Sequence, residues 1–260
     1  MSYEAIIGLE AHVELNTNSK MFCSCRVVDS TTSEPNCHVC PVCAGMPGAL
    51  PSINKRAVEI GILVSLALNC KIEDVSVFAR KNYFYPDLPK GYQISQYEKP
   101  LASNGYINIG DDHNTSKIHI RRVHLEEDTG KLVHTNDGEK PRGVSLIDLN
   151  RAGVPLLEIV SEPDIRSPLE AVNYAKELHS VLTYLEVNSG DMEKGVLRFE
   201  ANVSVRATGS KNLNTRREIK NLNSFKALQR SIEYEIKQQV TAYKSNETIL
   251  QETLGWDESN

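Results

Sequence analysis

The sequence lacks the features of a membrane or secreted protein. No apolar run approaches the roughly 20 residues that span a bilayer, and the opening MSYEAIIGLE has neither the basic flank nor the apolar stretch of a signal peptide. Because both features are missing, we expect a cytoplasmic protein with no membrane contact.

An excess of positive charge is missing as well, because the sequence has 29 lysines and arginines but 34 aspartates and glutamates. Its net charge of −5 argues against attraction of nucleic acid by the chain as a whole, although a local basic patch is compatible with it.

The common glycine-rich and nucleophile motifs are absent as well. The sequence contains no G-x-x-x-x-G-K-[ST], no G-x-G-x-x-G after a strand and no G-x-S-x-G. If the chain binds phosphate, side chains and a metal on a sheet must therefore do so in place of a glycine loop.

Cysteine is concentrated in one short segment. Of the six cysteines only Cys70 lies outside residues 23–43, and the other five are Cys23, Cys25, Cys37, Cys40 and Cys43. In a reducing compartment this clustering indicates a metal site more than disulfides, and C-x-C followed by C-x2-C can supply four thiolates to a tetrahedral Zn²⁺. A redox-active or incidental cluster is the alternative. Spacing alone does not choose between the pairs Cys37/Cys40 and Cys40/Cys43, and it does not exclude His38.

Several segments alternate so that a strand would have one apolar and one charged face. They include GLEAHVEL at residues 8–15, LRFEANVSVRA at residues 197–207 and RREIKNLNSF further on. A solvated outer face is the simplest interpretation of any one such strand. The charged faces of these segments carry Glu10, His12, Glu200, Glu218 and Lys220.

Helical patterns separate these strands. NKRAVEIGILVSLALN is apolar on most sides, and RSPLEAVNYAKELHSVLTYLEV begins with Ser167 as N-cap and Pro168 at the first position. A third helix begins near Phe225, and residues 81–96 predict a long loop or irregular hairpin. Because parallel strands are usually buried on both faces, the one-sided charge favours an α+β fold. We expect a mainly antiparallel sheet with helices on its apolar face and an open polar face.

The acidic side chains would form a site if they converge on that open face. Clustered carboxylates repel one another unless cations lie between them, and Mg²⁺ is bound by carboxylate and phosphate oxygens. Nearby bases could offset phosphate charge. Metal-assisted phosphoryl transfer, metal-dependent hydrolysis and a zinc-containing binding module without catalysis all remain open. The acidic candidates are Glu10, one of Glu126 and Glu127, Glu200 and Glu218, with His12; the basic ones are Arg80, Lys81, Lys90, Arg151, Arg198 and Lys220.

Seven blocks resemble, in order, the B subunits of the aspartyl/glutamyl-tRNA amidotransferases. They are IIGLEAHVEL, KMFCSC, CPVCAGMPGALPSIN, RKNYFYPDLPKGYQISQ, HLEEDTGK, LIDLNRAGVPLLEIVSEPDIRSP and EIKNLNSF. The resemblance implies one catalytic cradle domain over residues 1–260 that is similar to the glutamine synthetase catalytic fold. Within it we expect a zinc-binding insertion at 23–43 and a helical end at about 225–260. The resemblance also implies helical and tail domains that grip the tRNA, and we expect neither of them within residues 1–260.

The activity that this resemblance implies is that of an ATP-dependent carbon–nitrogen ligase with glutamine as amido donor. ATP would phosphorylate the side-chain carboxylate of Glu-tRNA(Gln), Asp-tRNA(Asn) or both, and ammonia would then displace phosphate. The A subunit would supply the ammonia and the C subunit would complete a heterotrimer. A truncated zinc-containing remnant that binds nucleotide or a partner, without amidating tRNA, is the alternative.

The resemblance also assigns residues to roles. It implies ATP, Mg²⁺ and Zn²⁺ as cofactors. By position in the motifs, the Mg²⁺ ligands would be Glu10, His12, Glu127 and Glu218, which would also be the catalytic residues, and the Zn²⁺ ligands would be Cys23, Cys25, Cys40 and Cys43. Charge and location in the motif blocks suggest three cofactor-binding bases: Lys81, Arg151 and Lys220.

Overall fold

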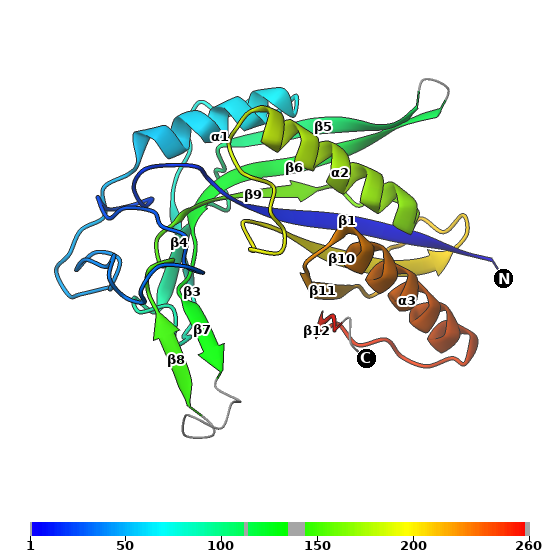
Figure 1. The fold of residues 1–260 in the computed structure, drawn as a ribbon. Helices are drawn as coiled ribbons and strands as arrows, with labels where there is room; N and C mark the ends of the chain where they lie inside the picture. The colour runs from blue at the N-terminus through cyan, green and yellow to red at the C-terminus, as the bar shows by residue number, and fades with distance from the viewer. Residues whose placement is uncertain (1, 112–113, 135–143, 258–260) are drawn as a thin grey trace.

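A computed structural model describes residues 2–111, 114–134 and 144–257, which form one large sheet with three helices on one of its faces (Figure 1). The eight-stranded sheet has the order β12-β11-β10-β1-β9-β6-β5-β2. Its neighbours pair antiparallel except β11 and β12, which are parallel. In chain order its strands are β1 (Tyr3–Glu14), β2 (Lys71–Ile72), β5 (Ala102–Asp111), β6 (Asn114–Glu127), β9 (Pro155–Ser161), β10 (Leu197–Ala207), β11 (Arg217–Leu222) and β12 (Thr253–Gly255).

The central strand β1 follows the alternation of its sequence. Leu9, Ala11 and Val13 are buried in the core, and the residues between them face the other side of the sheet. β1 pairs with β10 on one side and β9 on the other, so that Glu10 lies opposite Glu200. The expected α+β class with a mainly antiparallel sheet is confirmed.

The helices are α1 (Lys55–Ala67), α2 (Pro168–Tyr184) and α3 (Phe225–Lys244). The N-cap residue before each helix accepts a hydrogen bond from the first turn through its side chain; these residues are Asn54, Ser167 and Ser224 respectively. α1 packs on β5 and β6, α2 on β5, and α3 on β10 and β11. No helix among the described residues is both long and apolar enough to cross a membrane.

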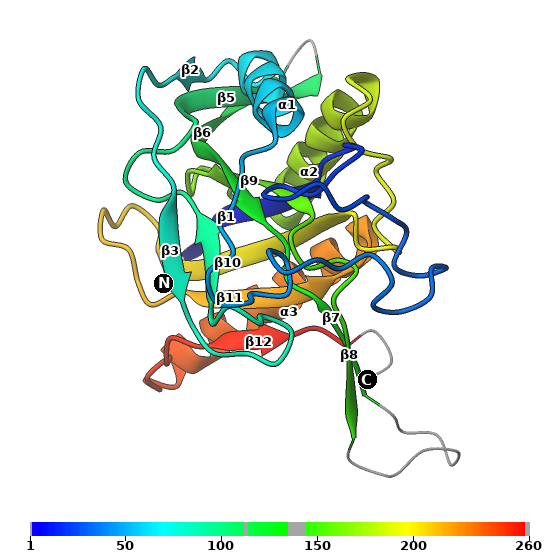
Figure 2. The ribbon, with the colours of Figure 1, turned by 90° about the vertical axis from the view of Figure 1, so that its left-hand side faces the viewer.

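Two hairpins lie outside the large sheet. β3 (Ala79–Asn82) pairs with β4 (Tyr92–Ser95), and β7 (Lys131–His134) pairs with β8 (Ser145–Asp148). In Figure 2 the β3–β4 hairpin lies in front of the sheet while α3 lies behind it. The irregular hairpin expected at 81–96 is therefore present, and it covers part of the polar face.

The end of the described chain differs from the expected helical end at about 225–260. α3 stops at Lys244, and Thr253–Gly255 then adds an edge strand parallel to β11. Trp256 packs partly against the core and contacts the ring of Tyr234 edge-on. Burial of this aromatic ring, which helical periodicity does not register, brings the segment back onto the sheet.

Candidate active site and metal centres

A cleft of about 880 Å³ is lined by the polar face of the sheet and by the β3–β4 hairpin. The hairpin contributes Arg80 and Lys81, and the sheet contributes acidic and imidazole side chains. Strand alternation puts the sheet residues on one face, while the register brings neighbouring strands level with one another. The titratable sheet residues that line the cleft are Glu10, His12, Arg122, His124, Glu126, Glu158, Glu200, Glu218 and Lys220.

One group of possible ligands comprises His12, Glu126 and Glu158, which we call the histidine cluster. One ligand atom from each lies within 4.8 Å of the others. Nε2 of His12 is 3.9 Å from Oε1 of Glu126 and 3.5 Å from Oε2 of Glu158. A second imidazole contacts both carboxylates: Nε2 of His124 lies 3.1 Å from Oε2 of Glu158 and 3.6 Å from Oε2 of Glu126.

Burial and charge act in opposite directions within the histidine cluster. Burial alone lowers the pKa of His12, but its hydrogen bond to Glu158 and the neighbouring carboxylates outweigh burial and raise the pKa to about 9. In Glu158, burial raises the pKa, but the two imidazoles outweigh burial and hold it well below its usual range. The cluster thus stabilises positive charge between carboxylates.

A second group comprises Glu10, Glu200 and Glu218, which we call the triglutamate cluster; its ligand atoms also lie within 4.8 Å of one another. Nζ of Lys220 lies 3.0 Å from Glu200 and 3.5 Å from Glu218. Burial first, and repulsion by Glu158 and Glu200 next, raise the pKa of Glu10. A carboxyl with a raised pKa among other carboxyls gains most when a cation neutralises the group.

Both clusters fit a divalent cation. Carboxylate oxygens are the preferred ligands of Mg²⁺, and each cluster leaves positions open towards the cleft for phosphate oxygens or water. The basic residues Arg80, Lys81 and Lys220 line the same cleft. This combination of acids and bases suits the binding of a metal-bridged polyphosphate.

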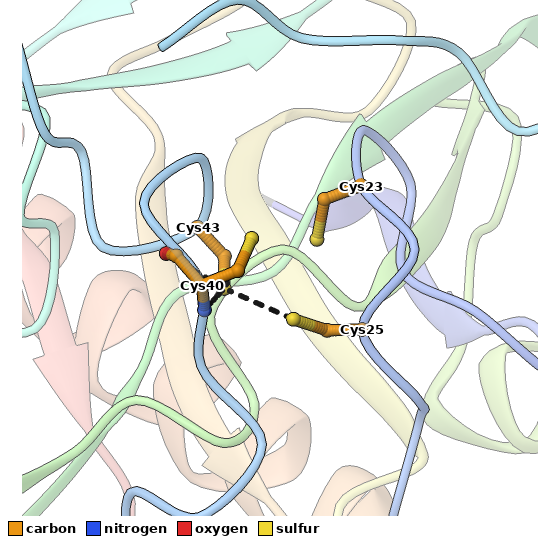
Figure 3. A group of neighbouring side chains, drawn as sticks. All are labelled: Cys23, Cys25, Cys40 and Cys43. Carbon is orange, nitrogen blue, oxygen red and sulfur yellow. Dashed lines mark hydrogen bonds between the residues drawn. The ribbon is translucent and has the colours of Figure 1, made fainter.

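A separate centre is formed by Cys23, Cys25, Cys40 and Cys43, whose side chains point towards one another (Figure 3). Sγ of Cys43 is 3.9 Å from Sγ of Cys25 and from Sγ of Cys40. A tetrahedral Zn²⁺ with Zn–S bonds near 2.3 Å needs sulfur atoms about 3.8 Å apart, so the four thiols fit this ion.

The two residues that spacing could not exclude lie outside the cysteine centre. Cys37 is exposed, and neither its thiol nor the ring of His38 belongs to the group of ligand atoms. The backbone of His38 is used instead, since its carbonyl accepts a hydrogen bond from Nζ of the buried Lys20. Lys20 also lies 3.5 Å from Sγ of Cys43. A hydrogen bond from Cys23 lowers the pKa of the Cys43 thiol most, and the positive charge of Lys20 lowers it further, so that the pKa is about 4.

Comparison with known proteins places the chain in a family. A model of the "GatB/GatE catalytic domain" matches residues 5–260. The chain belongs to the GatB/GatE catalytic-domain family. It is 54% identical over 260 residues to the B subunit of the aspartyl/glutamyl-tRNA(Asn/Gln) amidotransferase of Roseiflexus castenholzii, covering 100% of the chain and 53% of that relative.

Two further relatives carry the same description. The B subunit of Moorella thermoacetica is 56% identical over 259 residues, covering 100% of the chain and 54% of the relative. That of Thermoanaerobacter pseudethanolicus is 56% identical over 260 residues, covering 100% and 53%. The chain therefore spans about half the length of the curated relatives it matches.

In this GatB/GatE domain the expected acidic ligands do not all meet. Glu10, His12 and Glu218 line the cleft, but Glu127 does not. Oε1 of Glu127 lies 2.8 Å from Nζ of Lys90 and accepts a hydrogen bond from N of Ile94. The expectation that Glu127 converges with the other three is wrong, because consecutive residues of β6 turn to opposite sides and Glu126 is the one that faces His12.

Sequence reasoning overlooked Arg122, His124 and Glu158 in the cleft, and it left the choice between Glu126 and Glu127 open. Glu158 lies in the apolar run PLLEIV, where a lone carboxylate between hydrophobic residues was the available signal. His124 and Glu126 alternate with the buried Val123 and Leu125, and this period of two could have separated Glu126 from Glu127.

The three bases expected to bind the cofactor also divide. Lys220 and Lys81 line the cleft. Arg151 does not; its guanidinium donates to the carbonyls of Thr129 and Gly130 and lies 3.7 Å from Asp128. Arg151 therefore stabilises the turn after β6 and lies outside this cleft, while its role in binding a cofactor stays a prediction.

Proposed function

We propose that this chain is the ATP-using part of a tRNA-dependent amidotransferase. The observation that supports this most directly is the meeting of the histidine and triglutamate clusters in one cleft. The family match and the printed names of the relatives supply the reaction class. The substrates proposed are ATP with Glu-tRNA(Gln), Asp-tRNA(Asn) or both.

The first step would transfer the γ-phosphoryl group of ATP to the side-chain carboxylate of the aminoacyl group, giving an acyl phosphate and ADP. This step is needed because a carboxylate resists attack by ammonia. Mg²⁺ held by the two clusters would neutralise phosphate charge and keep the reacting oxygens in line. Glu10, Glu200 and Glu218 would hold one ion, while His12, Glu126 and Glu158 would hold another.

The basic residues of the cleft would position the nucleotide. Arg80 and Lys81 approach from the hairpin and Lys220 from the sheet, so phosphate oxygens between them would be contacted from both sides. Lys220 would turn from Glu200 and Glu218 towards phosphate when a metal takes over those carboxylates.

The second step would be attack of ammonia on the acyl phosphate, with phosphate as the leaving group and the amide as product. We propose that an A subunit supplies the ammonia and that a C subunit completes the complex. A catalytic fold similar to that of glutamine synthetase, as one domain over 1–260, is part of this proposal. Zn²⁺ on Cys23, Cys25, Cys40 and Cys43 would have a structural role, because four thiolates leave no open position on the ion.

The proposal can be tested by exchanging this chain for the matching half of the Moorella relative, in complex with that relative's A and C subunits. We expect Glu-tRNA(Gln)-dependent ATP hydrolysis, and a rate at least about tenfold lower in Glu200→Gln. Glu233→Gln, on the exposed side of α3, is the matched control and should be silent.

The competing idea is a remnant that binds nucleotide or a partner without acting on tRNA. We do not favour it, because nine titratable side chains of the sheet line the cleft and the candidate ligands among them remain close together. Mg·ATP binding without any tRNA-dependent hydrolysis in the exchanged complex, beside an active unaltered Moorella complex, would establish the remnant and overturn the amidotransferase proposal.

A further inference from the structure

A second, smaller groove of about 350 Å³ continues from the cleft along the polar face of the sheet. It shares Glu10, Tyr97 and Arg122 with the cleft. Beyond them it runs over Gly8 towards Arg216, which precedes β11. A ligand in this groove would therefore end beside the triglutamate cluster.

Arg122 lies in this groove and forms no ion pair with a carboxylate of the described residues. Its guanidinium lies over the ring of Tyr97, 5.3 Å from the centroid. Its Nε is buried without a hydrogen-bond partner among the described residues, and no described carboxylate lies within 4.0 Å of its nitrogen atoms. A buried donor without a partner costs free energy that a bound acceptor would recover.

The groove also contains Arg121 and Arg216, which differ in whether a carboxylate already binds the guanidinium group. Arg121 is bound by Glu162, with contacts of 3.0 and 2.7 Å. Arg216 is exposed and has no ion pair within the part of the chain that the structure describes. Two of the three guanidinium groups are thus available to an anionic ligand.

We propose that Arg122 and Arg216 form a phosphate-binding subsite adjacent to the triglutamate cluster. The planar guanidinium group offers paired N–H donors that match phosphate oxygens, and the Tyr97 ring fixes one of the two groups in advance. The subsite rests on the proposed ATP-dependent function, since phosphate here lies next to the carboxylates that would hold the metal. The phosphate belongs either to the nucleotide or to the terminal phosphodiester of the polynucleotide substrate.

Binding of two kinds of probe separates these sources. Calorimetry at fixed ionic strength would measure Mg·ATP and Mg·tripolyphosphate, and filter binding would measure an RNA acceptor minihelix. We expect Arg122→Gln and Arg216→Gln each to lower the affinity for at least one of these ligands by about tenfold or more. Arg216→Lys should retain part of the affinity, because it keeps the charge but loses the fork.

The matched control is Arg230→Gln, since Arg230 is exposed on α3, which covers the other face of the sheet. Because Arg122 is partly buried, circular dichroism and the melting temperature would check that its variant folds; Arg216, being exposed, provides the second variant. Loss of Mg·ATP and tripolyphosphate affinity assigns the subsite to the nucleotide, whereas loss of minihelix affinity alone assigns it to RNA.

Unchanged affinity for all three probes in both variants overturns the subsite. If the unaltered chain binds Mg·ATP and the arginine variants bind it and the minihelix equally well, the subsite fails while the proposed function stands. If the unaltered chain binds none of the probes, ATP-dependent function and subsite fail together.

Discussion

Glu126 and Glu127 are adjacent in the sequence, but only Glu126 belongs to the histidine cluster. Oε1 of Glu126 lies 3.9 Å from Nε2 of His12, and its Oε2 accepts a hydrogen bond from the hydroxyl of Ser95. Glu127 instead pairs with Lys90 at 2.8 Å. We therefore expect mutation of Glu126 to affect metal binding and mutation of Glu127 to affect stability.

We predict opposite results for Glu126→Gln and Glu127→Gln. The first should weaken binding of Mn²⁺, used as a spectroscopic substitute for Mg²⁺, by at least about tenfold. The second should leave Mn²⁺ affinity within about twofold but lower the free energy of unfolding by about 3 kcal/mol, because the largely buried Lys90 loses its carboxylate. Paramagnetic resonance and urea titration measure the two quantities, and equal loss of Mn²⁺ affinity would return Glu127 to the metal site.

A second prediction concerns the cysteine centre. Cys40→Ser should abolish stoichiometric zinc and lower the melting temperature by about 5–10 °C, because the loop loses a metal that organises it. Cys37→Ser should keep the zinc and melt within about 1 °C of the unaltered chain, since Cys37 is exposed outside the cluster. Elemental analysis and calorimetry provide the measurements. Equal loss of zinc in both variants would refute the ligand set.

A third prediction concerns pH. Burial, and then repulsion by Asp128, raise the pKa of Glu14 from 4.5 to about 8. Between these values the folded chain keeps a proton that the unfolded chain has lost, so the free energy of unfolding falls as pH rises. Glu14→Gln should remove up to about 1.4 kcal/mol per pH unit of this fall. Urea titrations between about pH 5 and pH 8 measure the slope.

Asp128 acts in the opposite sense at lower pH. Arg198 and Arg151 outweigh burial and lower its pKa to about 2, so the stability it contributes is present above its unfolded value of 3.8 and is lost as pH falls towards 2. Glu14→Gln should leave this acid limb in place. Identical slopes of the variant and the unaltered chain between about pH 5 and pH 8 would contradict the raised pKa of Glu14.

A fourth prediction separates nucleotide from tRNA. The chain should bind ATP only with Mg²⁺, because both acidic clusters repel unmetallated phosphate. Its affinity for Glu-tRNA(Gln) should be weaker than about 1 µM at physiological salt, since a net charge of −5 supplies little counterion release. Calorimetry with and without Mg²⁺, and filter binding at a stated salt concentration, test both parts. Tight tRNA binding by the chain alone would place the recognition surface within it.

Local sequence determined much of the fold. The alternation in residues 8–15 and 197–207 fixed which side chains of β1 and β10 face the core, because a strand turns successive residues to opposite faces. Ser167 and Pro168 marked the start of α2 for an equally local reason. The clustering of cysteine in 23–43 likewise indicates a metal centre from the sequence alone.

Only the tertiary structure decided the choices that residue spacing left open. The choice of Glu126 over Glu127 depends on which side chains of β6 point to the polar face that β6 shares with β9 and β1, and the inclusion of Glu158 depends on its register opposite His12. The selection of Cys40 and Cys43 beside Cys23 and Cys25 follows from the turn that buries Cys43. Strand pairing and loop closure join residues that are far apart in the chain. Their positions in space are therefore set by long-range packing, which the spacing of residue types along the sequence does not encode.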